Sequence, residues 1–326
     1  MKTEMELVDL SPQKSLFRID ILDGLRALRK KTPPKYLYDE RGSRLFEQIC
    51  DLEEYYPYRA ELEVLRDHAD TIVRRIGPGS LLLEFGSGAS VKTCSLLDRL
   101  QGPLTYVPID ISRTALLAST RRIRAQYSNV EVHPICSDFT AELRFPPGFF
   151  DGAEKRVAFF PGSTIGNFEP AEARLFLSRT ARLLGAGGLL LVGVDLLKSR
   201  VVLEAAYNDS QGVTAQFNLN LLRRINEELD GHFKPETFRH LASLNSAHSR
   251  VEMHLVSLEA QEVRIGETRI RFRQGESIHT ENSYKYEPVL FESLAVMAGY
   301  EVAEYWAHPD WNYRIYCLSV ASEGNE

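Results

Sequence analysis

The 326-residue sequence predicts an α/β fold with a mostly parallel central sheet and helices on both faces. Three observations predict it. Short apolar runs typical of buried strands alternate with amphipathic segments between residues 61 and 195. A glycine-rich turn follows the first of these runs, and the alternation resumes after residue 286. Strands and helices that alternate at this spacing favour a parallel sheet, because each crossover helix covers one face.

The expected elements of this region follow one another in a regular order. The strands are expected at residues 81–85, 106–110, 130–136, 156–160 and 189–194. Helices are expected at 91–100, from Ser112 as N-cap through 125, and at 171–184. Pro170 suits the first position of the last helix, and the glycines from Gly185 suit its end.

Residues 196–286 interrupt this rhythm. The elements expected there are helices near 215–229 and 235–244, followed by antiparallel strands from 250 to 273. The α/β pattern then returns with a helix near 288–297 and strands at 300–307 and 313–319.

We therefore expect two domains. A core would be formed by residues 61–195 with 287–322, and a second α+β domain by residues 15–60 with 196–286. The first part of that second domain is a polar arm in which tyrosine is dense. Because an insertion leaves the alternation of the core intact on both sides, the two domains would be intertwined along the chain.

Composition excludes several classes of protein. The formal net charge is −6 and basic residues are dispersed, so nucleic-acid binding is not expected. No apolar run approaches the roughly 18 residues that span a bilayer, and the first residues lack a signal-peptide core. We expect a cytoplasmic monomer with no membrane partner and a small-molecule substrate.

Cysteine and histidine usage gives no metal or disulfide signal. The four cysteines, Cys50, Cys94, Cys136 and Cys317, lie far apart, which fits reduced thiols. The eight histidines form no cluster with ligand-like spacing, so no metal is expected.

Residues at three successive strand ends predict a nucleoside site. Gly86-Ser87-Gly88 follows the first strand, where glycine lets backbone approach a ligand. Asp110 ends the second strand, where an acid can accept ribose hydroxyl hydrogens. Asp138 and Phe139 follow the third, with an acid for an adenine amino group and a ring to cover the base. Each feature alone is often a turn or a solvated strand end, but their joint placement favours a ligand site.

The glycine spacing distinguishes between nucleotide folds. Dinucleotide-binding folds usually show G-x-G-x-x-G, whose third glycine lets the helix pack beneath a pyrophosphate. Here Val91 takes that third position, and Glu84 gives the E-x-G-x-G pattern of S-adenosylmethionine (SAM) enzymes. The sequence thus predicts a Rossmann-like class I SAM methyltransferase core with SAM as cofactor. An NAD oxidoreductase and a SAM-binding module without turnover remain as alternatives.

Four segments occur together in this chain: Tyr36 to Ser43, Glu54 to Pro57, Glu84 to Gly88 and Gly162 to Asn167. With them the chain resembles the histidine-specific Nα-methyltransferase family of ergothioneine biosynthesis, over residues 15 to 321. The resemblance implies SAM-dependent Nα-trimethylation of L-histidine to histidine betaine (hercynine). A related enzyme for another aromatic amino acid, such as tryptophan, is the nearest alternative.

The resemblance also implies site residues. For SAM these are Gly86, Lys92, Asp110, Asp138 and Phe139, of which Lys92 has no support from strand-end spacing. The chain departs from the usual family residues at Phe85 and at 284–286, which make none of the implied polar contacts.

For the amino-acid substrate, the resemblance implies contacts at each end of the molecule. Asn167 and Tyr207 would bind the carboxylate, and Tyr38 and Tyr56 would lie beside the α-amine as catalytic residues. The imidazole would meet the strand segment Glu281-Asn282-Ser283. Three further residues match pocket positions of the family: Met253, Gly162 and Thr214.

Overall fold

The computed structural model describes residues 7–10, 14–143 and 145–321. Their contacts divide the chain into two compact units. The first unit contains Pro57–Leu197, the residues from Lys285 onward and the strand β1 (Val8–Leu10). The second unit contains residues 14–56 and Lys198–Tyr284.

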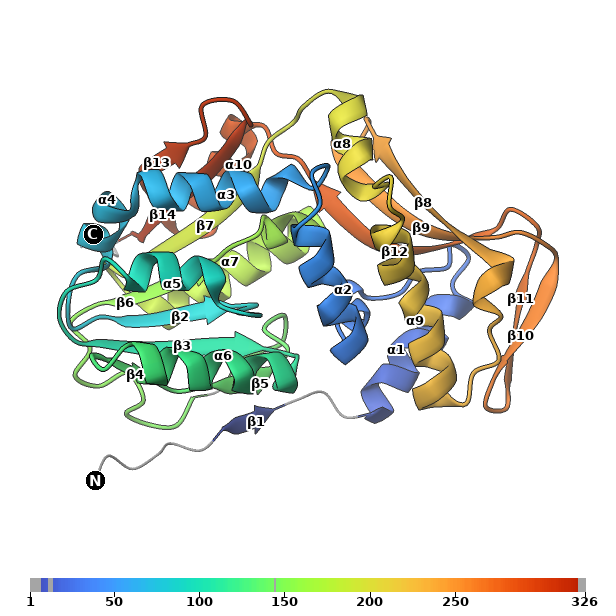
Figure 1. Ribbon diagram of the computed structural model, residues 1–326, viewed down its shortest axis with the longest axis horizontal. Helices are drawn as coiled ribbons and strands as arrows, with labels where there is room; N and C mark the ends of the chain where they lie inside the picture. The colour runs from blue at the N-terminus through green and yellow to red at the C-terminus, as the bar shows by residue number, and fades with distance from the viewer. Residues whose placement is uncertain (1–6, 11–13, 144, 322–326) are drawn as a thin grey trace. The chain divides into compact units, whose positions relative to one another are not determined.

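The first unit is built on one large sheet (Figure 1). Its strands are β1, β2 (Leu81–Phe85), β3 (Leu104–Asp110), β4 (Val130–Val132), β5 (Ile135–Ser137), β6 (Arg156–Phe160), β7 (Leu189–Asp195), β13 (Tyr300–Ala307) and β14 (Tyr313–Val320). The order is β1-β5-β3-β2-β6-β7-β14-β13, with β4 also paired to β3. Pairs from β1 to β7 are parallel, whereas β14 runs antiparallel to β7 and β13. The predicted α/β class with a mainly parallel sheet is therefore confirmed.

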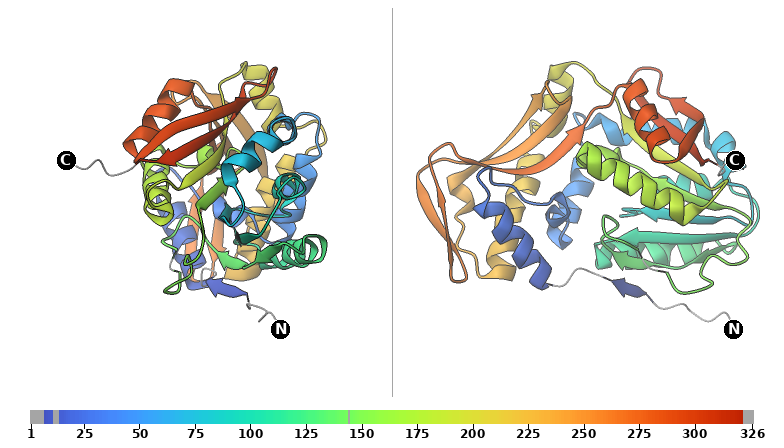
Figure 2. Two further views of the ribbon diagram at one scale, coloured as in Figure 1. Left: turned by 90° about the vertical axis from the view of Figure 1, so that its left-hand side faces the viewer. Right: turned by 180° about the vertical axis from the view of Figure 1, so that it is seen from behind.

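Helices cover both faces of this sheet. They are α3 (Tyr56–Asp67), α4 (Ala69–Ile76), α5 (Val91–Leu97), α6 (Arg113–Gln126), α7 (Pro170–Leu184) and α10 (Pro288–Met297). Helices α3 to α6 lie over one face, and α7 and α10 over the other (Figures 1 and 2). All five residues of β2 are buried, which explains why the strand is a nearly continuous apolar run.

One expected strand of the first unit is interrupted. Residues 130–136 form β4 and β5 rather than a single strand, with His133 and Pro134 between them. Proline has no N–H to donate to a sheet ladder, which accounts for the break at this point.

The second unit combines helices with antiparallel strands. Its helices are α1 (Lys14–Arg26), α2 (Glu40–Cys50), α8 (Arg200–Tyr207) and α9 (Val213–Leu229), with short 3-10 turns η1 (Pro34–Leu37) and η3 (Pro235–Thr237). The strands β8 (Phe238–Asn245), β9 (Arg250–Ser257) and β12 (Ser277–Tyr284) form one antiparallel sheet in the order β12-β9-β8. A separate hairpin joins β10 (Gln261–Ile265) and β11 (Thr268–Phe272).

The helix expected at residues 235–244 was wrong. Only η3 is helical there, and Phe238–Asn245 is the strand β8. Apolar residues at 238, 241 and 242 imitate the spacing of a helix face. All eight residues of β8 nevertheless pair with β9, so tertiary pairing overrides the local pattern.

Candidate functional site

The glycine loop after β2 has a backbone that suits a bound nucleoside. Gly86 and Gly88 have φ of 70° and 47°, in the left-handed region that favours glycine. A Cβ at Gly88 would meet no atom within 4 Å, so this backbone faces open space. A Cβ at Gly86 would come within 3.5 Å of the Phe139 ring, which places that predicted adenine cover beside the loop.

Asp110 joins this loop to the start of α6. Its Oδ2 accepts the Gly88 N–H at 2.7 Å, and its Oδ1 accepts the Ser112 N–H at 2.7 Å. Burial raises the pKa of Asp110, while these backbone N–H bonds act against that rise. Each carboxylate oxygen can accept more than one hydrogen bond, so the side chain can still receive a ribose hydroxyl.

Glu84 lies beneath the loop and is 1% exposed. Tyr106 Oη donates a short hydrogen bond to Glu84 Oε2, and Ser90 Oγ lies 3.0 Å from Tyr106 Oη. Burial raises the pKa of Glu84 to about 7. This acid therefore supports the loop through β3 and is not exposed to a ligand.

Asp138 and Phe139 follow β5 as predicted. Asp138 Oδ1 accepts the Thr140 N–H at 2.9 Å and the Thr140 hydroxyl at 2.5 Å, which fixes the turn after the strand. The Phe139 ring packs edge-on against Phe160, with ring centroids 5.5 Å apart.

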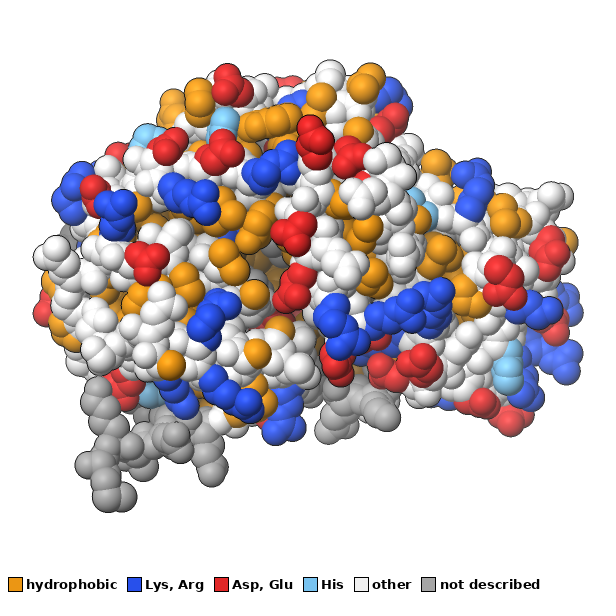
Figure 3. All heavy atoms as spheres, viewed as in Figure 1, with side chains coloured by type: hydrophobic (Ala, Val, Ile, Leu, Met, Phe, Trp, Pro, Cys, Tyr) orange, Lys and Arg blue, Asp and Glu red, His pale blue; other side chains and the backbone are white. Residues whose placement is uncertain are grey.

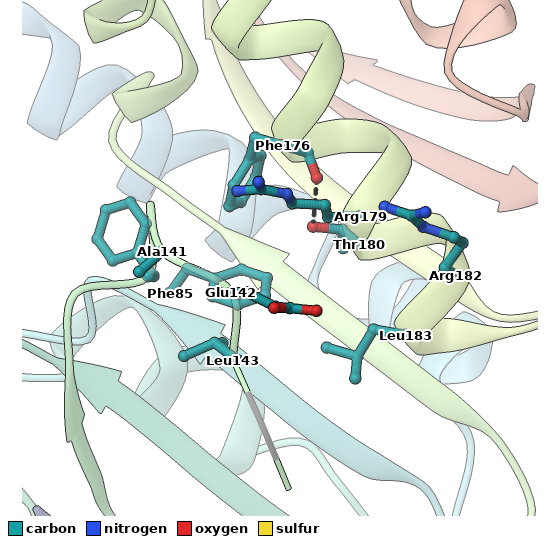
Figure 4. A pocket seen from close by; sticks show the side chains of 10 residues that line it. Phe85, Ala141, Glu142, Leu143, Phe176, Arg179, Thr180, Arg182 and Leu183 are labelled. Atoms are coloured by element: carbon teal, nitrogen blue, oxygen red, sulfur yellow. Dashed lines mark hydrogen bonds between the residues drawn. The ribbon is translucent and has the colours of Figure 1, made fainter. Parts of the chain in front are cut away.

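A cavity of about 280 Å³ lies between this turn and α7 (Figure 4). Phe139, Phe85 and Phe176 form its aromatic part, and Glu142 and Arg179 contribute charge. Phe85, where the chain departs from the family, packs edge-on against Phe176 at 5.2 Å. Phe85 therefore belongs to an aromatic cluster beside the expected adenine position.

Lys92 and Gly162 are brought together by an acid that the sequence had not indicated. Lys92 Nζ lies 2.5 Å from Glu61 Oε2, and the Gly162 N–H donates to the same oxygen at 2.7 Å. Lys92 Nζ also lies 5.0 Å from the centroid of the Tyr58 ring. The only sequence signal for Glu61 was an acid next to the apolar positions of a helix.

Asn167 ends the 3-10 turn η2 (Thr164–Asn167), which follows β6. Ser163, before the turn, has a φ of 55°, and its hydroxyl accepts the Asp195 N–H at 2.9 Å. Thr164 Oγ1 donates to the Pro161 carbonyl at 2.7 Å. These contacts fix the turn that carries Asn167 at the ends of β6 and β7.

In the second unit, one predicted carboxylate residue, Tyr207, contacts one predicted imidazole residue, Ser283. Tyr207 Oη and Ser283 Oγ are 2.7 Å apart, and both residues are buried. Glu281 lies opposite Met253 in the β12–β9 register. Glu281 and Ser283 share one face of β12, because side chains two residues apart in a strand point the same way.

Asn282 belongs to the other face of β12. Its Oδ1 is 2.8 Å from His279 Nε2. Of the three residues of the predicted segment, Glu281 and Ser283 therefore lie on the same face of β12, and Asn282 lies on the opposite face and bonds His279.

His240 fixes the Tyr207 backbone from β8. Its Nε2 is 2.8 Å from the Tyr207 carbonyl oxygen, which can only accept, so Nε2 donates. Asn218 Nδ2 donates to His240 Nδ1 at 3.0 Å. Burial lowers the pKa of His240, which favours this neutral form.

The predicted amine-side tyrosines lie in aromatic surroundings. Tyr38 packs edge-on against Phe46 and Phe217, at 5.5 and 5.4 Å. Tyr55, for which the sequence predicts no contact with the substrate, packs edge-on against Tyr207 at 5.9 Å. Burial raises the pKa of Tyr55 well above its usual range, so its hydroxyl stays protonated.

Tyr56 has a cation on its ring. It is 1% exposed, and Lys198 Nζ lies 4.6 Å from its ring centroid. Thr214 stands in the first turn of α9, where its N–H donates to Asp209 Oδ1 at 2.8 Å.

The surface charges are mixed, and the described residues form neither a metal cluster nor a membrane-spanning helix. Basic and acidic side chains are interspersed on the face drawn in Figure 3. Within residues 7–10, 14–143 and 145–321, no group of three or more His, Cys, Asp or Glu side chains could hold a metal. Among the helices of those same residues, none has the length and apolar character that crossing a membrane requires.

Comparisons with known proteins agree with the motifs. A family model described as a histidine-specific, SAM-dependent methyltransferase matches residues 17–320. Histidine N-alpha-methyltransferase of Mycobacterium tuberculosis is 40% identical over 295 residues, which are 89% of this chain and 90% of the relative. The protein of that name from Mycolicibacterium smegmatis is 38% identical over 297 residues, 90% of this chain and 91% of the relative.

A fungal relative matches less closely over a longer stretch. The N-methyltransferase imqF of Aspergillus flavus is 29% identical over 331 residues, 97% of this chain and 89% of the relative. The match to the family model over nearly the whole chain confirms the resemblance and the predicted cofactor. The chain belongs to the family of histidine-specific, SAM-dependent methyltransferases.

Proposed function

We propose that this enzyme trimethylates the α-amine of L-histidine and so forms hercynine, a first step of ergothioneine biosynthesis. The observation that carries the proposal is that Glu281 and Ser283 lie on the same face of β12, with Tyr207 Oη 2.7 Å from Ser283 Oγ. Two mycobacterial relatives named histidine N-alpha-methyltransferase match about nine tenths of the chain.

We assign one task to each compact unit. The unit of Pro57–Leu197 with the residues from Lys285 holds the glycine loop, Asp110, Asp138 and Phe139, and would bind SAM. The unit that contains Lys198–Tyr284 holds most of the residues expected around histidine, and would bind the amino acid.

The pair on β12 would favour an imidazole ring over other side chains. A Glu281 carboxylate accepts one ring N–H, and the Ser283 hydroxyl can complement the other ring nitrogen. Indole has a single ring nitrogen and would leave one of these polar groups without a partner. Sites built on hydrogen bonds reject analogues that leave a buried group unpaired, which favours histidine over tryptophan.

Methyl transfer to an amine depends mainly on position. SAM supplies a methyl group on a cationic sulfur, and the new N–C bond forms as the S–C bond breaks. An amine attacks through its lone pair and must therefore be neutral, and a free α-amine has a pKa of about 8. We assign no strong base to this step, because neutral amine is accessible at ordinary pH.

Tyr38 and Tyr56 would orient the α-amine nitrogen and stabilise the methylated ammonium that forms on it. Their hydroxyls can bond the amine, and aromatic faces attract a methylated ammonium. The Tyr56 ring already holds the Lys198 cation at 4.6 Å, which supports this capacity. Asn167 and Tyr207 would bind the carboxylate with an amide N–H and a phenol O–H.

Mass spectrometry tests the substrate directly. The protein is incubated with SAM and a mixture of the common amino acids, and we expect histidine alone to gain three methyl groups. Methylation of tryptophan in place of histidine would favour the alternative, and no methylation of any amino acid would contradict the proposal.

Paired affinity measurements test the two assignments. We expect Glu281→Ala to weaken histidine binding far more than binding of S-adenosylhomocysteine, and Asp110→Ala to do the reverse. A lost hydrogen bond to a charged group costs about 1.5–3 kcal/mol, or roughly ten- to hundredfold in affinity. Calorimetric titrations that show equal losses for both ligands would contradict the assignment of tasks.

We also propose that the enzyme acts as a cytoplasmic monomer. The four cysteines are free thiols, which fits a reducing compartment. Light scattering in solution should give the mass of one chain, and twice that mass would contradict the monomer.

A further inference from the structure

Glu61 is a buried carboxylate that links three elements of the first unit. It lies on α3 and is 0% exposed. Its Oε2 is 2.5 Å from Lys92 Nζ on α5 and accepts the Gly162 N–H, which follows β6, at 2.7 Å. One oxygen thus holds a cation and a backbone amide from two elements that the sequence places 70 residues apart.

The second oxygen of Glu61 is fixed by close packing. Glu61 Oε1 is buried and has no hydrogen-bond partner among the described residues. A Cβ at Gly193 on β7 would lie 2.1 Å from this oxygen and 2.4 Å from Tyr313 Oη. Only glycine at position 193 leaves room for the Glu61 side chain, so the carboxylate has little freedom to turn.

A fully buried carboxylate is costly unless its partners compensate. The Lys92 ammonium does so here, and its own side chain is 13% exposed. A lysine side chain is flexible, and ordering it costs about 2 kcal/mol of rotamer entropy. If a fixed partner already orders the side chain in the free protein, ligand binding does not have to supply this free energy. The ammonium has three N–H donors and can serve more than one acceptor.

We propose that Glu61 is a positioning residue of the cofactor site: it holds the Lys92 ammonium in place for the carboxylate at the amino-acid end of SAM, which is the anionic group of that ligand, and it fixes the backbone at Gly162. The inference rests on the proposed contact between Lys92 and SAM. Glu61 itself would act through these two groups. A change at Glu61 should therefore weaken binding only of ligands that carry the amino-acid end, which Lys92 is expected to contact.

Two ligands separate positioning from general structural support. S-adenosylhomocysteine carries the amino-acid end, whereas 5′-methylthioadenosine has the same nucleoside without it. Glu61→Gln keeps the shape and an acceptor for Gly162 but removes the charge beside Lys92. We expect the Kd of S-adenosylhomocysteine to rise about tenfold or more, and that of methylthioadenosine to change less than about twofold.

Glu63→Gln is the matched control. It makes the same change on the same helix, but Glu63 Oε2 bonds His308 Nε2 at 2.6 Å and leaves Lys92 untouched. We expect both affinities to stay as in the unaltered protein. If Glu61→Gln weakens both ligands equally, or neither, Glu61 is no positioning residue and the inference is overturned.

Lys92→Met distinguishes this inference from the proposed cofactor contact. Unchanged binding of S-adenosylhomocysteine by Lys92→Met would remove Lys92 from the site, whatever Glu61 does. A loss with Lys92→Met but not with Glu61→Gln would overturn the role of Glu61 alone. Should Glu61→Gln fail to fold, Glu61→Asp keeps the charge but shortens its reach, and wild-type affinity there would also overturn the inference.

Discussion

At the scale of single residues, burial raises the pKa of two acids near the glycine loop, Asp110 and Glu84, but their hydrogen-bond partners differ. Asp110 accepts backbone N–H groups from Gly88 and Ser112, which favour its charged form. Glu84 is 1% exposed and accepts from the Tyr106 hydroxyl, and burial raises its pKa to about 7. Asp110 is therefore suited to receive a ligand hydroxyl, while Glu84 makes the stability of the core depend on pH.

The pH dependence from Glu84 has a defined sign. Its folded pKa of about 7 lies above the ordinary 4.5, so the folded state holds the proton more tightly. This stabilisation is complete below pH 4.5 and is lost as the pH rises through about 7. A shift of this size corresponds to about 3 kcal/mol, at 1.36 kcal/mol per pKa unit.

Glu84→Gln should remove this dependence, because glutamine keeps an acceptor for Tyr106 and does not titrate. Urea unfolding of both proteins from about pH 5 to about pH 8 measures the difference. We expect the unaltered protein to lose stability relative to the variant as the pH rises. A difference that stays constant with pH would contradict the raised pKa.

The positions of the residues that we assign to the cofactor site could be predicted to unequal degrees. Gly86 and Asp110 could be predicted because parallel strand ends meet at one edge of a sheet, so position in sequence gives position in space. Glu61 could not, because an acid beside an apolar helix face is usually solvated. Its partners Lys92 and Gly162 come from other elements, and only the folded chain brings them to it.

At the scale of elements, the local sequence predicted helix ends correctly where proline and glycine mark them. The helix α7 begins at Pro170 and ends before Gly185 as expected, because proline and glycine act through their own backbone geometry. Strand β8 was mistaken for a helix because its apolar spacing fits both periods, and its pairing with β9 is a long-range property. Which face of the sheet Glu281 and Ser283 occupy is likewise set by the pairing of β12 with β9.

The start of α2 depends on a single side chain. Asp39 caps the helix, since its Oδ1 accepts the Gly42 N–H at 2.7 Å, and it also accepts from Asn220 Nδ2 on α9 at 2.7 Å. Asp39→Ala removes a cap worth about 0.5–2 kcal/mol and leaves the buried Asn220 without that partner, which costs about 1–3 kcal/mol more.

We therefore expect Asp39→Ala to lower the free energy of unfolding by about 2–4 kcal/mol, and Asp39→Asn to lower it less because it retains an oxygen acceptor. Chemical denaturation measures both. Because Tyr38 adjoins this cap, histidine affinity should fall with Asp39→Ala more than with Asp39→Asn. A stability of Asp39→Ala equal to that of the unaltered protein would show that the cap contributes little.

At the scale of the whole molecule, the chain passes between its compact units after Leu197 and again after Tyr284, in addition to an earlier passage after Tyr56. A buried ion pair stands beside the last two crossings, within the first unit. Lys285 Nζ is 2.8 Å from Asp195 Oδ2, with side chains 1% and 0% exposed. The Tyr286 N–H also donates to the Asp195 carbonyl at 3.1 Å, so side chains and backbone together fix the two segments.

Removing one member of this pair should be costly, because the other remains charged and buried. We expect Lys285→Met to lower the free energy of unfolding by about 3–5 kcal/mol. Arg44→Met is the matched control, since its partner Glu40 and Arg44 itself are 64% and 62% exposed. Such a surface pair contributes about 0–1 kcal/mol. Denaturant titrations of the two variants measure the contrast.

The double variant Lys285→Met with Asp195→Leu then separates charge from packing. Replacing both members of a buried pair by apolar residues is often neutral or stabilising, so it should recover much of the stability that Lys285→Met loses. The Asp195 N–H that bonds Ser163 is backbone and survives the change, so the loop that carries Asn167 should keep its anchor. A double variant as unstable as the single one would show that lost packing, and not an unpaired charge, is what the crossing cannot tolerate.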